Sequence, residues 1–123
     1  MYACHLPSGR TATVRADELF PTASLIKTAI MLALFDRIER GELSYHQYFE
    51  YDGKHVYEGM NDDILSRFRL GEKIRLSKLI MLMITISDNT ASRWCQALAG
   101  GGAQINATLE AHGFQSLRIN SRT

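Results

Sequence analysis

The chain has 123 residues, 46% of them hydrophobic, which is enough to bury one modest core. Its 14 Lys and Arg residues nearly balance its 13 Asp and Glu residues, so the net charge of +1 argues against nucleic acid or an anionic membrane as a partner. The longest purely apolar run covers residues 29–35, far short of the roughly 20 residues of a membrane-spanning helix.

The N-terminal segment has the pattern of a β-hairpin. Two short β-prone stretches, residues 2–6 and 11–15, flank the turn-forming sequence Pro7-Ser8-Gly9-Arg10. Because an isolated hairpin is barely stable in water, we expect it to lie on another part of the fold. We expect no further convincing strands downstream, apart from a possible short one around residues 48–51, in an irregular stretch rich in Tyr, His and Asp.

The rest of the chain favours helices. Residues 24–39 carry apolar side chains on nearly every face, which indicates a helix buried in the centre of a domain, and Gly41 follows as a natural stop. The pattern predicts three more helices and one brief helical turn, at residues 78–86 (with Ser77 as N-cap), 89–98, 103–112 and 62–68. The resulting fold is mainly α with an N-terminal β-hairpin.

The first candidate site is Ser24-Leu25-Ile26-Lys27, at the start of the central helix. Residues three apart share a helix face, so the Ser24 hydroxyl and the Lys27 ammonium can approach hydrogen-bonding distance. A serine needs a neighbouring base to act as a nucleophile, and a lysine among apolar side chains loses its proton more easily than one in water. The alternative is that Ser24 only caps the helix while Lys27 extends towards solvent.

The second candidate site is Ser87-Asp88-Asn89, between two predicted helices. These residue types are also common at helix ends, so capping alone would explain them. In a functional site, Ser87 would relay a proton and Asn89 would bind substrate, while Asp88 would hold the turn in shape.

Together the two motifs resemble those of class A serine β-lactamases and penicillin-binding proteins. Ser87-Asp88-Asn89 begins 63 positions after Ser24, and Phe20-Pro21-Thr22-Ala23 and Gly41-Glu42-Leu43 also match this family. The resemblance implies that Ser24 is acylated by a β-lactam or a D-alanyl peptide, that Lys27 accepts its proton, and that Ser87 passes a proton to the leaving nitrogen. It also implies that Asn89 touches the substrate amide and that the protein is periplasmic or secreted; it implies no cofactor.

Two features of the family are absent from the sequence. Its Lys-Thr-Gly strand motif has no counterpart, since Lys27-Thr28 is followed by Ala29. The class A deacylating glutamate belongs to the loop just after the region that matches residues 117–123, so either it lies beyond Thr123 in a longer chain or this lineage lacks it. The sequence is therefore interpreted as a single truncated domain, with a hairpin at residues 1–16 and a helical subdomain at residues 17–123, lacking the later strands of the α+β fold. We expect a complementary C-terminal half, or a swapped dimer, to cover the apolar surface that this leaves open.

Other functions are alternatives to this one. A non-catalytic fragment or penicillin-binding module without turnover fits the missing strand motif. A DNA-binding helix-turn-helix around residues 77–98 fits poorly, because its apolar helix offers no basic face. The four isolated histidines lack the spacing of a metal site, and the cysteines, Cys4 and Cys95, are expected to be unconnected thiols.

Overall fold

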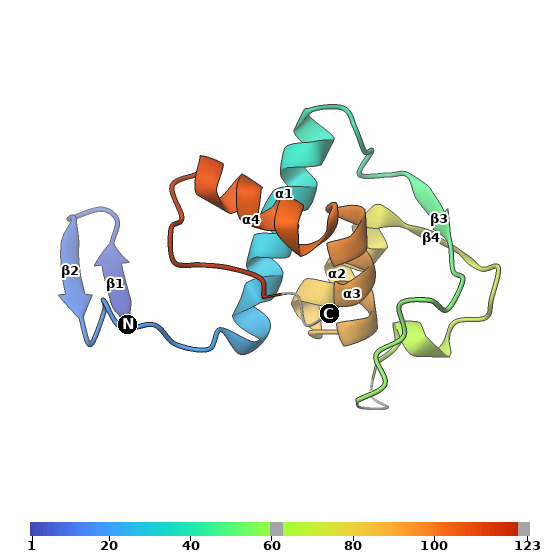
Figure 1. Ribbon diagram of the computed structural model, residues 1–123, viewed down its shortest axis with the longest axis horizontal. Helices are drawn as coiled ribbons and strands as arrows, with labels where there is room; N and C mark the ends of the chain where they lie inside the picture. Colours follow the sequence, from blue (N-terminus) through green and yellow to red (C-terminus); the bar gives the residue numbers. More distant parts are fainter. Residues whose placement is uncertain (60–62, 121–123) are drawn as a thin grey trace.

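The computed structural model describes residues 1–59 and 63–120, which form a helical body with a small sheet at one end and a projecting hairpin at the other (Figure 1). The elements, in chain order, are β1 (Tyr2–His5), β2 (Arg10–Thr13), the 3-10 turn η1 (Ala23–Leu25), α1 (Ile26–Glu39), β3 (Tyr48–Glu50), the 3-10 turn η2 (Leu65–Arg67), β4 (Lys73–Arg75), α2 (Leu76–Thr85), α3 (Asn89–Leu98) and α4 (Gly101–Ala111). No helix among the described residues is both long and apolar enough to cross a membrane.

The predicted hairpin is present, and its antiparallel register pairs Tyr2 with Thr13 and His5 with Arg10. All the residues of both strands are exposed. Figure 1 shows the hairpin held away from the helices by an extended segment. The expectation that the hairpin lies on another element of this chain is therefore wrong, and both of its faces are open.

The second sheet is only partly predicted by the sequence. β3 lies where a short strand was expected, but β4 was missed; it pairs antiparallel with β3, with Phe49 opposite Ile74. β4 has only three residues, and Ile74 is its one buried side chain, so it shows too little alternation to stand out in the sequence. The sheet packs by its aromatic residues against α3, where the Phe49 and Tyr51 rings contact Trp94.

The helices lie close to their predicted positions, with differences at their ends. α2 begins at Leu76 with Arg75 as N-cap, so Ser77 lies inside the first turn and the prediction that it caps the helix is wrong. α4 begins two residues earlier than expected, because Gly100 adopts a left-handed conformation with φ 95° that ends one helix and lets the next begin. The predicted turn at residues 62–68 is reduced to η2, and residue 62 lies outside the described residues.

The core lies where α1, α2, α3 and α4 meet. It contains the inward faces of α1 and α2, including Ile30, Leu34, Leu79 and Met83, each at most 1% exposed. The opposite faces are more open than the sequence predicts, since Phe35 and Met81 are 40% exposed. The two cysteines are free, with Cys4 exposed and Cys95 buried in α3.

Replacing Leu34 with alanine should test this core. Because Leu34 is fully buried, Leu34→Ala should lower the free energy of unfolding by about 2 to 5 kcal/mol. Leu70→Ala, at a leucine that is 75% exposed, should change it by less than about 0.5 kcal/mol. Urea unfolding followed by Trp94 fluorescence would measure both, and equal losses in the two variants would contradict this packing.

Candidate active site

Ser24 sits in the tight turn that leads into the central helix. It is the middle residue of η1, and α1 follows directly from Ile26. The preceding residue, Ala23, has φ 44°, a conformation that residues with a side chain rarely adopt. Ser24 and Lys27 line the same hollow of about 460 Å³, together with Ser87.

The side chain of Lys27 enters the bend that carries the second motif. Its Nζ donates to the Ser87 carbonyl oxygen at 2.5 Å, to Ser87 Oγ at 2.7 Å and to Asn89 Oδ1 at 2.9 Å. Lys27 is only 6% exposed, so the idea that it extends into solvent is wrong. The three N–H groups of the ammonium thus have three acceptors, two from Ser87 in the loop between α2 and α3 and one from Asn89, the first residue of α3.

Ser24 is connected to Lys27 through Ser87. Ser87 Oγ donates to Ser24 Oγ at 3.0 Å and accepts from Lys27 Nζ. The hydrogen bonds found among the described residues include no direct one between Lys27 and Ser24, because the Ser87–Asn89 acceptors take the ammonium protons. The arrangement is a short chain of polar atoms, from the Ser24 hydroxyl through Ser87 Oγ to the amine.

Burial lowers the pKa of Lys27, in the direction expected from the sequence. The negative charges of Asp63 and Asp88 oppose this effect and raise the pKa, but less than burial lowers it. The neutral amine is therefore more accessible near neutral pH than it is in a surface lysine.

The loop of the second motif is shaped by Asp88. Ser87 has φ 60°, an unfavourable backbone conformation for a residue with a side chain. Asp88 is 2% exposed and accepts hydrogen bonds from Ala91 N at 2.7 Å and from Leu65 N at 3.0 Å. It caps α3 and ties the bend to η2, and these contacts offset the cost of the strained residue beside it.

Asp63 is a site residue that the sequence analysis missed. It is 6% exposed and accepts from Asn89 N at 2.9 Å, from Thr90 N at 2.8 Å and from Thr90 Oγ1 at 2.8 Å. It lies in the irregular stretch between β3 and η2, 26 positions before Asn89, so no local spacing connects the two. Nothing in the sequence distinguishes Asp63 from the other 12 acidic residues.

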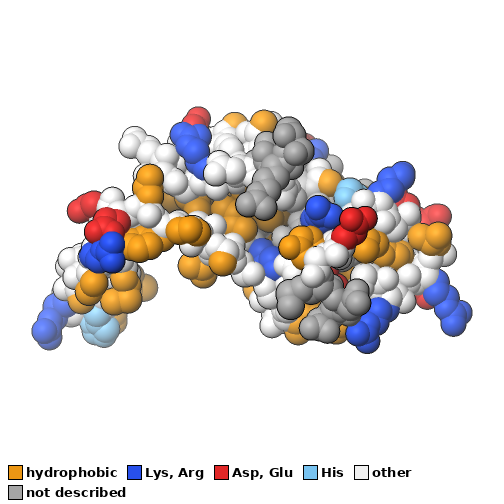
Figure 2. Space-filling model, turned by 60° about the horizontal axis from the view of Figure 1, so that its bottom comes forward, with side chains coloured by type: hydrophobic (Ala, Val, Ile, Leu, Met, Phe, Trp, Pro, Cys, Tyr) orange, Lys and Arg blue, Asp and Glu red, His pale blue; other side chains and the backbone are white. Residues whose placement is uncertain are grey.

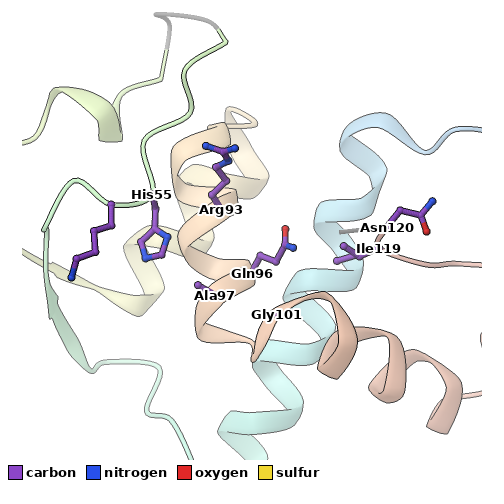
Figure 3. A pocket seen from close by; sticks show the side chains of 8 residues that line it. His55, Arg93, Gln96, Ala97, Gly101, Ile119 and Asn120 are labelled. Carbon is purple, nitrogen blue, oxygen red and sulfur yellow. The ribbon is translucent and has the colours of Figure 1, made fainter. Parts of the chain in front are cut away.

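A second hollow, of about 440 Å³, lies between α3, the start of α4 and the loop after β3 (Figure 3). Its basic side chains already have partners in the protein. Lys54 pairs with Asp52, the His55 ring stacks on Trp94, and Arg93 donates to the Val56 carbonyl oxygen. Burial lowers the pKa of His55, which favours its neutral, stacked form. This hollow lacks the serine–lysine pairing found at Ser24, and no group of three metal-ligating side chains occurs among the described residues.

The sequence model of the beta-lactamase enzyme family matches residues 1–123. The chain belongs to this family. Among solved structures, a variant of PBP-A captured as an acyl-enzyme complex with penicillin G is 28% identical, with a TM-score of 0.87 over 98% of this chain. A β-lactamase from Chitinophaga pinensis DSM 2588 and an ancestral class A β-lactamase are each 24% identical, with TM-scores of 0.87 and 0.85 over 96% of this chain.

These comparisons confirm the fold predicted from the two motifs, which is the helical part of the class A β-lactamase fold. The chain covers 44% of each of these three structures, so it spans less than half of their length.

Removing the Asp88 carboxylate should weaken the bend. Asp88→Ala leaves the N-terminus of α3 uncapped and the Leu65 N–H without its partner, so the free energy of unfolding should fall by about 2 kcal/mol or more. Urea unfolding of Asp17→Ala, at an exposed aspartate, provides the control. Equal stability of the two variants would show that Asp88 does not hold the bend.

Proposed function

We propose that the chain carries the acyl-accepting nucleophile of a serine hydrolase or acyltransferase that reacts with β-lactams or related amides. The observation that carries the proposal is the polar chain from Ser24 Oγ through Ser87 Oγ to the buried amine of Lys27. The likeness to the PBP-A variant, which has the same fold and forms an acyl-enzyme with penicillin G, supports it.

In the proposed reaction, Ser24 Oγ attacks the carbonyl carbon of the β-lactam. The new bond joins Oγ to that carbon, and the ring C–N bond breaks. With the two hydroxyls turned so that Ser24 Oγ donates to Ser87 Oγ, the serine proton moves through Ser87 Oγ to the neutral Lys27 amine. Lys27 then gives this proton back through Ser87 Oγ to the departing nitrogen, so that Lys27 and Ser87 both end as they began. The protons balance, and the product is an ester of Ser24.

The surroundings suit a carbonyl substrate at Ser24. The backbone N–H of Ser24 lies at the start of a helix, where the helix dipole stabilises a developing oxyanion. Asn89, whose Oδ1 accepts from Lys27, would use its amide group to bind the substrate amide. Leu25, Met83 and Ile84 add apolar surface to the hollow.

A second possibility is a penicillin-binding module that keeps the fold without turnover. Adduct lifetime separates the two functions, since a hydrolase releases the acyl group and a binding module retains it.

Labelling with a fluorescent penicillin tests the nucleophile. Intact mass should increase by one penicillin per chain, and Ser24→Ala should abolish the adduct because the attacking oxygen is gone. Ser44→Ala, at an exposed serine away from the hollow, should label like the wild type. The proposal fails if no adduct forms even after addition of a complementary C-terminal half, or if Ser24→Ala still labels.

We also propose that the remainder of such a domain, from further polypeptide or a second chain, covers the open apolar surface. Figure 2 shows hydrophobic side chains on the hairpin and along the strip joining it to the helices. The exposed hydrophobic residues of the hairpin and the strip include Leu6, Val14, Leu19, Phe20 and Leu25, between 55% and 87% exposed. A contiguous surface of this kind is typical of an interface rather than of an isolated monomer.

Size-exclusion chromatography with light scattering tests this surface. The chain alone should elute as a dimer or larger species, and a complementary half should convert it to a defined complex. Leu19→Lys should reduce self-association because it places a charge on this surface, whereas Leu70→Lys, at an exposed leucine before β4, should not. A well-behaved wild-type monomer that ignores the added half would reject the interface.

A further inference from the structure

Two buried carboxylates hold the Ser87–Asn89 bend and the segment before η2 against each other. Asp88 reaches back from the bend to Leu65 N at 3.0 Å. Asp63 reaches forward from that segment to Asn89 N at 2.9 Å and to Thr90 N and Oγ1 at 2.8 Å. Each segment thus places a side-chain carboxylate on the other's backbone, although they lie more than twenty positions apart in the chain.

Helix capping alone does not account for Asp63. The N-cap of α3 is Asp88, whose carboxylate already satisfies Ala91 N. Asp63 accepts hydrogen bonds from the two backbone N–H groups before Ala91, those of Asn89 and Thr90. Because Asp63 is only 6% exposed, its charge needs donors of this kind. One of the two residues that it binds is Asn89, whose side-chain oxygen accepts a hydrogen bond from Lys27 Nζ.

We propose that Asp63 is a positioning residue for the Ser24 site, which fixes the backbone at Asn89 and Thr90 so that Ser87 and Asn89 present their oxygens to Lys27. A role for Asp63 in a reaction rests on the function proposed above. The effect of Asp63 on the hydrogen bonds of Lys27 is independent of that function and can be measured without any substrate.

Geometry and charge then act together. The bend supplies the three acceptors of the Lys27 ammonium, and Ser87 within it has φ 60°, so the bend needs outside support to keep this shape. The charged groups that act on Lys27 are Asp63, from the segment before η2, and Asp88, from the bend. Both raise the Lys27 pKa against the effect of burial, so removing the Asp63 charge should lower that pKa further.

The substitution Asp63→Asn separates this role from simple structural support. It preserves the shape but removes the charge and turns one acceptor into a donor facing backbone N–H groups. The Lys27 Cε signal, assigned in ¹³C-lysine-labelled protein with a Lys27→Met variant, should titrate at lower pH than in the wild type. Asp17→Asn, the same change at an exposed aspartate, should leave the Lys27 titration unmoved.

Acylation by the fluorescent penicillin gives the second readout, measured with the complementary half present. In Asp63→Asn the acid limb of the pH–rate profile should move to lower pH, because Lys27 loses its proton more easily. The plateau rate should fall on the order of 10- to 100-fold, because Ser87 and Asn89 are no longer held in position relative to Lys27. A purely structural residue would lower the amount of folded protein without moving the limb.

Asp63→Glu covers the case in which Asp63→Asn does not fold. It keeps the negative charge but changes the reach by one methylene, so the Lys27 titration should stay close to that of the wild type while the plateau rate falls. The proposal is overturned if folded Asp63→Asn titrates and acylates like the wild type, or if Asp63→Glu acylates at the full rate. If the wild type forms no adduct, the function of Ser24 fails, and the Lys27 titration still decides whether Asp63 controls the network.

Discussion

The arrangement of the site depends on one buried ammonium group. The Lys27 side chain extends from the central helix and is almost completely shielded from water. Its charge therefore needs oxygen atoms of the protein as hydrogen-bond partners. The bend between α2 and α3 provides them, from the Ser87 carbonyl, the Ser87 hydroxyl and the Asn89 amide. A change that moves this bend removes hydrogen bonds from a buried charge and so lowers the stability of the fold. The stability of the fold is thus coupled to the chemistry of the site.

The bend is not stable by itself, because Ser87 occupies a backbone region that costs energy. Two aspartates compensate, and they do so by joining parts of the chain that are distant in sequence. Asp88 accepts a hydrogen bond from the backbone of η2, and Asp63, just before η2, accepts one from the backbone at the start of α3. The segment that carries Asp63, directly before η2, thus supports the structure of the site.

The described residues pack well on one side of the molecule and leave the other side open. Its helices form a well-packed core on one side, yet Leu25 beside the nucleophile and the whole N-terminal hairpin remain exposed. In structures of the same fold that are more than twice as long, further chain is available to pack against such surfaces. Under the proposed function, the hollow at Ser24 is one wall of a site that further chain would complete.

The sequence by itself determined the helices, the hairpin and the family, because apolar periodicity, turn residues and the pairing of Ser24-x-x-Lys27 with Ser87-Asp88-Asn89 are local patterns. It also indicated that burial lowers the pKa of Lys27, since the neighbours of Lys27 along the helix are apolar. It missed β4 and Asp63, and it placed Lys27 directly beside Ser24, whereas Ser87 lies between them. Only the tertiary structure decided these contacts, because they join residues that are distant along the chain and depend on which side chains fill the space between packed helices.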